Sequence, residues 1–267
     1  MSSPSPSSYR ACQPPPPGHV DLWLCGTEAL TPARRAAYGA LLSAAEQERH
    51  RRFAVEHARD AFLLGRALVR TSLSHYADVT PREWVFAVGD HGRPFVAEPR
   101  LSARLHFNLS HTRGLVACAV SAGPHIGVDV EQMDRRLDPM ALSAATFAAP
   151  ENEAVQSSPE DHRRETFFRI WTLKEAYIKA LGVGLSLPLD SFWFDLGPPP
   201  RLHVTEGRPA DDWQFFEQQA TPGHWLALAH GPSGGSPLQV RSQWVAPLEP
   251  AGLQASAGQP PGRRGVP

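Results

Sequence analysis

The sequence contains very little cysteine. Its three cysteines are Cys12, Cys25 and Cys118, and no two of them have the two-residue spacing of zinc ribbons and redox motifs. An odd, scattered set of thiols supports neither a disulfide framework nor a structural zinc site. Because Cys25 and Cys118 lie within apolar runs, we expect both to be small buried hydrophobic side chains.

Net charge and long hydrophobic runs are missing as well. The 26 Lys and Arg residues nearly balance the 27 Asp and Glu residues, so the chain has no overall field to attract nucleic acid or an anionic membrane. No stretch approaches the roughly 18 apolar residues of a membrane helix, and the N-terminus lacks a basic-then-apolar signal pattern. We therefore expect a cytoplasmic protein that binds neither nucleic acid nor membrane.

Basic residues are nevertheless concentrated in one segment. Residues 49–70 contain six arginines and two histidines within an otherwise evenly charged chain. Any site for a polyanionic ligand must therefore be local, and this segment is a candidate for it.

The overall composition is that of a globular protein, with 267 residues, 42% of them hydrophobic and 20% charged. Segments rich in Ser and Pro at residues 1–18 and 247–267 predict disordered tails. Between the tails, the order strand, helices, strands occurs twice, on either side of a turn at residues 122–125. We expect an α+β fold in two halves, residues 19–123 and residues 124–246.

Local motifs predict several element boundaries. Thr31 before Pro32 predicts a helix start, because a hydroxyl caps the first turn and proline fits the first helical position. Ser43 and Glu46 have the spacing of a capping box, and the apolar pattern after them predicts one long helix or two consecutive ones with a basic face. Residues 84–96 have the pattern of strand, turn and strand.

The segment IGVDVEQM in the second half carries two carboxylates at alternating positions. Alternate side chains of a strand share a face, so Asp129 and Glu131 point together, away from the apolar residues between them. Adjacent carboxylates repel each other unless a cation lies between them, and Mg²⁺ is the natural cation for oxygen ligands. The alternative interpretation is a solvated strand face that is paired with lysines or arginines of a neighbouring element.

The segment WTLKEAYIKALG carries three charged residues within an apolar helix. Glu175 and Lys179 lie on one side of it, and such a pair is worth only about 0.2–0.5 kcal/mol on an exposed surface. The surrounding aromatic and aliphatic residues indicate a largely buried helix, in which charges need partners or a function. Glu175 and the two strand carboxylates suit a metal bound to phosphate, whereas Lys174 either meets a nucleotide or reaches solvent.

Two further segments offer groups for phosphate. In FNLSHTRG, Ser110 and His111 follow a strand into a turn, where hydroxyl, imidazole and backbone N–H groups bind phosphate oxygens. Ordinary turn residues are the alternative there. In DHGRPFV, Arg93 before Pro94 is held extended and can reach a phosphate or a base, although a plain hairpin turn explains the segment equally well.

In this order and at these separations, GRPFV, FNLSH, IGVDVE and WTLKEAYIKALGVGLSLPL resemble the motifs of 4'-phosphopantetheinyl transferases of the surfactin-synthetase-activating (Sfp) type. The resemblance covers about residues 20–230. It implies a monomer of two similar α+β halves related by pseudo-twofold symmetry, with coenzyme A bound in the cleft between them.

The resemblance also implies roles for individual residues. Three carboxylates would hold Mg²⁺ together with the diphosphate of coenzyme A, and these are Asp129, Glu131 and Glu175. The other implied contacts with coenzyme A are Lys179 and His111 at the phosphates, Ser110 at the nucleotide end, Arg93 and Pro94 beside the adenine, and Arg49 and Arg52 at the 3'-phosphate.

One position departs from the family pattern. Where that pattern has a phosphate-binding arginine shortly before LLG, this chain has Ala61, and its neighbour on that side is Asp60. Arg59 can replace the missing arginine only if the helix presents it differently.

The implied reaction moves the 4'-phosphopantetheine arm of coenzyme A to a serine of an apo acyl or peptidyl carrier protein, and it releases adenosine 3',5'-bisphosphate. Such carriers serve fatty-acid, polyketide or nonribosomal-peptide synthesis. We expect Glu175 to deprotonate the serine, directly or through a metal-bound water, and Lys179 to stabilise charge on the departing phosphate. The alternatives are a Mg²⁺-dependent hydrolase of a nucleotide diphosphate and a coenzyme A-binding module without turnover.

Overall fold

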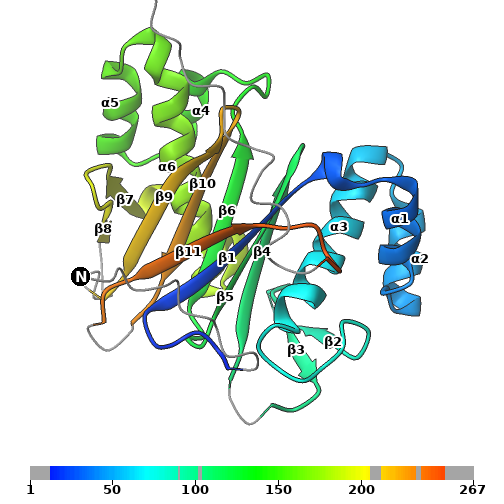
Figure 1. Cartoon of the computed structure of the whole chain (residues 1–267). Helices are drawn as coiled ribbons and strands as arrows, with labels where there is room; N and C mark the ends of the chain where they lie inside the picture. The colour runs from blue at the N-terminus through cyan, green and yellow to red at the C-terminus, as the bar shows by residue number, and fades with distance from the viewer. Residues whose placement is uncertain (1–12, 90, 102–103, 205–211, 233–235, 250–267) are drawn as a thin grey trace, which may run out of the picture.

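The computed structural model describes residues 13–89, 91–101, 104–204, 212–232 and 236–249, and it confirms an α+β fold in two halves, each with a sheet and helices (Figure 1). The first half contains β1 (His19–Gly26), η1 (Thr27–Ala29), α1 (Pro32–Gly39), α2 (Ala44–Arg52), α3 (Glu56–Leu73), β2 (Val85–Val88), β3 (Pro94–Glu98), β4 (His106–Thr112) and β5 (Leu115–Ser121). The second contains β6 (Ile126–Gln132), α4 (Pro139–Thr146), α5 (Ala149–Ser157), α6 (Glu160–Leu181), η2 (Gly184–Ser186), η3 (Leu189–Ser191), β7 (Phe192–Asp195), β8 (Arg201–Val204), β9 (Gln214–Thr221) and β10 (His224–His230).

Strand pairing repeats between the halves. In the first half β1 pairs with β5 and β5 with β4, and in the second β6 pairs with β10 and β10 with β9, all antiparallel. Each half also has a two-stranded hairpin, β2–β3 or β7–β8, between its helices and its last two strands. The duplication is therefore one of topology, whereas the pseudo-twofold rotation and a ligand cleft stay predictions.

The last strand of the described chain, β11 (Gln239–Trp244), returns to the first sheet and lies parallel to β1. The sequence contains no sign of this return, because the pattern of a strand does not encode its pairing partner. β11 lies within residues 124–246 but belongs to the sheet of the first half. The division of the chain into domains at residues 19–123 and 124–246 therefore stays a prediction.

The two sheets pack face to face, with helices on their outer faces. Leu22 and Leu24 of β1 share a buried cluster with Val128 and Val130 of β6, whereas Trp23 between them packs in a second cluster with residues of α3. On the far face of the second sheet, α6 packs against β6 and β10. The apolar positions of β6 thus face the first sheet, and Asp129 faces α6, as the alternation of the strand predicts.

Most of the local predictions are confirmed. Thr31 accepts a hydrogen bond from the Arg34 amide, and Ser43 and Glu46 form both bonds of the capping box. Two helices, α2 and α3, follow that box rather than one long helix. Cys25 and Cys118 are buried, as expected.

The two predicted tails lie mainly outside the described residues, which exclude residues 1–12 and 250–267. Within the described part of the second tail, the Tyr38 hydroxyl donates to the Pro247 carbonyl at 3.0 Å, and Glu249 pairs with Arg34. Of the helices that the structure describes, none has both the length and the apolar character to cross a bilayer.

Gly127 allows β6 to lie close against α6. A Cβ atom at this position would overlap the Ala176 carbonyl and would lie 2.5 Å from the Ala180 nitrogen. We expect Gly127→Ala to lower the free energy of unfolding by about 3 kcal/mol or more, because the atoms that the new Cβ would meet belong to the backbone of α6 and cannot move aside as a flexible side chain can.

Urea unfolding of that variant measures the effect. The control is Gly223→Ala, because a Cβ there meets no described atom within 4 Å. Equal stability of the two variants would contradict the close packing of β6 on α6.

Candidate active site

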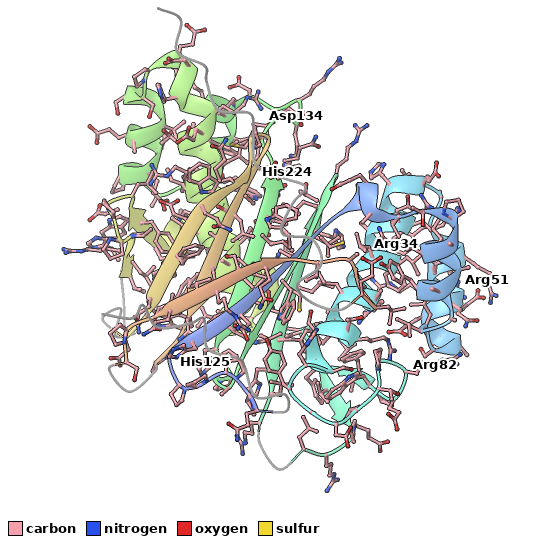
Figure 2. All side chains as sticks on the ribbon, viewed as in Figure 1. Arg34, Arg51, Arg82, His125, Asp134 and His224 are labelled. Carbon is pink, nitrogen blue, oxygen red and sulfur yellow. The ribbon has the colours of Figure 1, made fainter. Side chains whose placement is uncertain are left out.

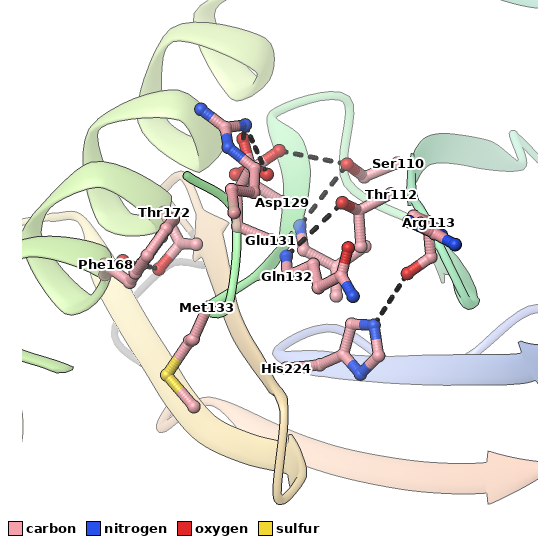
Figure 3. A network of polar contacts seen from close by, with 12 residues as sticks. Ser110, Thr112, Arg113, Asp129, Glu131, Gln132, Met133, Phe168, Thr172 and His224 are labelled. Atoms are coloured by element: carbon pink, nitrogen blue, oxygen red, sulfur yellow. Dashed lines mark hydrogen bonds and ion pairs between the residues drawn. The ribbon is translucent and has the colours of Figure 1, made fainter. Parts of the chain in front are cut away.

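A ladder of side chains joins the two sheets where β4 and β6 lie side by side. Three β4 side chains at alternating positions accept hydrogen bonds from backbone amides of β6. Asn108 accepts from Val128 at 3.0 Å, and Figure 3 shows the other two bonds, in which Ser110 accepts from Val130 and Thr112 from Gln132 at 3.3 Å each. Since β6 pairs with β10 on its other side, these bonds satisfy amides that would otherwise be unpaired.

Asp129 lies at the centre of this junction and is only 5% exposed. Its Oδ1 accepts hydrogen bonds from Lys179 Nζ at 2.7 Å and from the Ser110 hydroxyl at 2.9 Å. Its Oδ2 is buried and has no hydrogen-bond partner among the described residues. A buried carboxylate oxygen without a partner is costly, so this atom is a natural position for a cation.

Lys179 connects α6 to both sheets. Its ammonium group donates to Asp129, to the Ser110 hydroxyl at 2.9 Å and to the Val128 carbonyl at 3.3 Å. These three bonds use all three of its protons. The Val128 bond is the longest of the three, so it is the one that a phosphate oxygen would replace most easily.

Glu131 and Glu175 lie within the electrostatic field of Asp129. Burial raises the pKa of both carboxyl groups, and the negative charge of Asp129 raises it further. Two cations act in the opposite direction. Arg135, which pairs with Glu131 at 2.8 Å, lowers the pKa of Glu131, and the charge of Lys179 lowers the pKa of Glu175. Both side chains are thus near Asp129 in a site where negative charge is in excess.

The described residues contain no group of three or more His, Cys, Asp or Glu side chains arranged to hold a metal ion. The predicted ligand set of Asp129, Glu131 and Glu175 is therefore not assembled in the structure, and it stays a prediction. The donor chemistry suits a hard cation nonetheless, since the unpartnered Oδ2 of Asp129 is the kind of ligand that Mg²⁺ binds.

Cations from two elements, α6 and α2, act on His111 at the end of β4. Loss of hydration lowers the pKa of the imidazole, and the positive charges of Lys179 and, more weakly, Arg49 lower it further, while Asp129 acts in the opposite direction. Arg49 on α2 also lies over the Phe62 ring at 5.3 Å. The positive charges of Lys179 and Arg49 therefore both act on His111.

The other arginines predicted near the 3'-phosphate have protein partners. Arg52 is exposed and pairs with Glu48 at 3.1 Å, and Arg59 donates to the Phe53 carbonyl at 2.7 Å. Ala61, where the family pattern has an arginine, is buried. The assignment of Arg49 and Arg52, both on α2, to the 3'-phosphate stays a prediction.

Arg93 connects the β2–β3 hairpin to the second half. Its guanidinium donates to the carbonyls of Ala180 at 3.1 Å, Pro124 at 3.0 Å and Ile126 at 3.0 Å. Pro94 begins β3 and pairs with Val88. The carbonyl of Ala180 lies in the last turn of α6, where a cation is also favoured by the helix dipole.

We expect Arg93→Ala to lower the free energy of unfolding by about 1.5–3 kcal/mol, because three carbonyls lose a charged donor. Urea unfolding measures this loss. Arg51→Ala is the control, since Arg51 is exposed and its one ion pair within the described part of the chain is with Glu48. We expect this variant to change stability by about 0.5 kcal/mol or less. An Arg93→Ala protein as stable as the wild type would show that the guanidinium is free for a ligand.

Lys174 corrects a prediction. It meets neither solvent nor the junction of the sheets: it is fully buried, pairs with Glu151 of α5 at 2.7 Å, and donates to the carbonyls of Leu189 and Phe192 at 2.6 Å each. Glu151 in turn accepts from the Phe194 amide at 2.9 Å. The signal in the sequence was a lysine within an apolar helix, which demands a buried partner.

Two family models match the chain. The model described as the 4'-phosphopantetheinyl transferase superfamily matches residues 125–229, and the model described as 4'-phosphopantetheinyl transferase, N-terminal, matches residues 31–123. The 4'-phosphopantetheinyl transferase HetI of Nostoc sp. is 36% identical over 180 residues, which are 67% of this chain and 73% of that protein. The 4'-phosphopantetheinyl transferase Sfp of Bacillus subtilis is 31% identical over 191 residues, 70% of this chain and 81% of that protein.

One solved structure shows a weaker likeness. The Thermotoga maritima holo-[acyl-carrier-protein] synthase aligns with 41% of this chain and 64% of its own at 21% identity, with a TM-score of 0.34. That score is too low to support a structural argument.

Proposed function

The chain belongs to the 4'-phosphopantetheinyl transferase superfamily, of the two-domain Sfp type, and from this premise we propose the details of its reaction. The enzyme moves the 4'-phosphopantetheine arm of coenzyme A to a serine of an apo acyl or peptidyl carrier protein. The reaction depends on Mg²⁺ and releases adenosine 3',5'-bisphosphate. We also propose that the enzyme acts as a cytoplasmic monomer.

One observation carries the proposal beyond family membership. At the junction of the two sheets, the buried Asp129 has one oxygen held by Lys179 and Ser110 and the other without a partner. The unpartnered oxygen of Asp129 can bind a cation, and the ammonium group of Lys179 beside it can bind an anion. This pair of groups suits a ligand that brings metal and phosphate together.

Asp129, Glu131 and Glu175 are the proposed ligands of Mg²⁺, which when bound supplies positive charge against the diphosphate of coenzyme A. Mutual repulsion supports this set, because the charge of Asp129 raises the pKa of both glutamates. A cation among the three would relieve that repulsion.

The residues of the chain would perform the remaining steps. Lys179 and His111 bind the diphosphate, and Lys179 exchanges its long bond to the Val128 carbonyl for a phosphate oxygen. Glu175 takes the proton of the carrier serine, whose oxygen then bonds to the phosphorus on the pantetheine side. The bond to the bridging oxygen breaks, and its electron pair leaves on the 5'-phosphate of adenosine 3',5'-bisphosphate beside Lys179.

Other residues would hold the nucleotide. Arg49 and Arg52 on α2 are the proposed contacts of the 3'-phosphate, supported by the positive charge that Arg49 contributes around His111. Arg93 and Pro94 are proposed to lie beside the adenine, with the guanidinium anchored to backbone carbonyls while the hairpin contacts the base.

The test separates this reaction from its two alternatives. The protein is incubated with coenzyme A and Mg²⁺, with and without an apo carrier protein, and adenosine 3',5'-bisphosphate is quantified by chromatography. We expect release only when the carrier is present. Release without the carrier would indicate a hydrolase, and binding of coenzyme A without release in either mixture would indicate a binding module.

A further inference from the structure

We propose that Arg66 of α3 binds the 3'-phosphate of coenzyme A, in place of the arginine that the family pattern has at the position of Ala61. This inference rests on the proposed function, because it names a further residue of the coenzyme A site. Arg66 lies within the basic segment 49–70, and neither its spacing nor the resemblance assigns it a role.

Two aromatic rings hold the guanidinium group of Arg66. Its central carbon lies 5.4 Å from the centre of the Phe62 ring, one turn earlier on α3, and 5.9 Å from the centre of the Phe86 ring on β2. The face of an aromatic ring attracts a cation electrostatically and occupies none of its N–H groups. The rings therefore restrain the guanidinium and leave its donors available.

Those donors have few acceptors within the protein. The side chain of Arg66 is only 15% exposed, and its one ion pair in the described part of the chain joins Nε to Glu46 Oε1 at 3.4 Å. That distance exceeds the usual length of an N–H···O hydrogen bond, and the guanidinium donates no hydrogen bond to any described residue. A guanidinium has five N–H donors, and a largely buried cation needs acceptors for them. An anionic ligand can supply these acceptors.

Arg70, one turn further along α3, shows how a structural arginine differs. It donates to Glu46 at 2.7 Å and to the carbonyls of Trp84 at 2.6 Å and Pro81 at 3.2 Å. Glu46 thus forms its short bond with Arg70, whereas Arg66 has only the long contact with the same carboxylate. The nearby acceptors serve Arg70 and leave Arg66 free to bind a ligand.

Positive charge is in excess around Arg66. Burial lowers the pKa of its guanidinium, and the charges of Arg49 and Arg70 lower it further, while Glu46 acts in the opposite direction. A phosphate group beside these arginines would relieve their mutual repulsion. The planar fork of a guanidinium also matches two oxygens of a phosphate.

Arg49 connects this place to the proposed diphosphate site. Its guanidinium carbon lies 5.3 Å from the centre of the same Phe62 ring. Its charge acts on both Arg66 and His111, and the charge of Lys179 acts on His111 as well. Besides the diphosphate proposed to bind at Lys179 and His111, coenzyme A has one other anionic group, the 3'-phosphate. The two arginines beside Phe62 therefore suit that phosphate.

The experiment compares coenzyme A with 3'-dephospho-coenzyme A, which lacks only the 3'-phosphate. Each ligand is titrated by calorimetry, with Mg²⁺ in every mixture, into the wild type and into Arg66→Met. The methionine keeps an apolar side chain between the rings, and Glu46 keeps its bond with Arg70, so no carboxylate is left unpaired.

We expect the affinity of Arg66→Met for coenzyme A to be about 10-fold to 100-fold lower than that of the wild type, because charge-assisted hydrogen bonds to the phosphate are lost. Its affinity for 3'-dephospho-coenzyme A should stay within about twofold of the wild type.

The control is Arg51→Met, which removes a positive charge from the same basic segment at an exposed position of α2 (Figure 2). We expect its affinity for both ligands to stay within about twofold of the wild type. Arg66→Lys retains a cation beside the rings, and we expect it to recover part of the affinity for coenzyme A that Arg66→Met loses. If the lysine variant binds coenzyme A no better than Arg66→Met, the charge at this position does not act on the ligand, and the inference is wrong.

The two ligands distinguish the possible failures. If Arg66→Met lost affinity for both ligands equally, or for neither, Arg66 would not contact the 3'-phosphate, and the inference would be overturned while the proposed function stands. The same holds if the wild type bound the two ligands with equal affinity. A wild type that binds neither ligand would contradict the coenzyme A site of the proposed function, and the inference with it.

Discussion

Asp129→Asn is expected to lower kcat/KM for phosphopantetheine transfer more than about 100-fold, because loss of a metal ligand should exceed the 10-fold to 100-fold effect of losing a residue that only orients one. The amide still offers an oxygen to Lys179 and Ser110, so the junction of the sheets can form. What disappears is the charged, unpartnered Oδ2 at the centre of the site. Steady-state kinetics at saturating Mg²⁺ measure the change.

The control for this variant is Asp134→Asn, the same chemical change on an exposed side chain just beyond β6. We expect its transfer rate to stay within about twofold of the wild type. If Asp129→Asn had the kinetics of the wild type, the assignment of Asp129 as a metal ligand would be contradicted.

Lys174→Met is expected to lower the free energy of unfolding by about 3–5 kcal/mol, the usual result when one member of a buried ion pair is removed. The Glu151 carboxylate would remain buried against Phe194 and Ala148 without its cation. The double variant with Glu151→Gln should regain most of the lost stability, since no unpaired charge is left. Urea unfolding of the single and double variants measures the coupling.

This loss should also depend on pH. Burial raises the pKa of Glu151, and Lys174 opposes the rise, so removing the lysine raises it further. A carboxyl group whose pKa is higher in the folded state gains stability as pH falls, because folding takes up a proton. The deficit of Lys174→Met should therefore be largest at neutral pH and shrink toward pH 5. A small, pH-independent deficit would contradict the buried pair.

Within a single strand or helix, periodicity predicted which side chains share a face. Alternation put Asp129 and Glu131 on one face of β6, and helical spacing put Glu175 and Lys179 on one side of α6. These predictions require only side-chain direction within one strand or helix, which is a local property. The same reasoning found the caps at Thr31 and Ser43.

Contacts between elements could not be predicted in this way. Ser110, Asn108 and Thr112 share a face of β4 by alternation, but that this face meets the edge of β6 depends on how two sheets pack. The same holds for Arg93, whose acceptors are backbone carbonyls, which carry no sequence signal. Many charged residues lie at the surface, among them Arg51, Arg82 and Asp134 (Figure 2), and only the apolar surroundings of Lys174 in the sequence distinguish it from them.

The most direct test of the account is the intact mass of an apo carrier protein after incubation with this protein, coenzyme A and Mg²⁺. We predict a gain of one phosphopantetheine group, lost when the acceptor serine of the carrier is replaced by alanine and strongly reduced with Asp129→Asn. No mass gain on any of several acyl and peptidyl carrier proteins would contradict the proposed function.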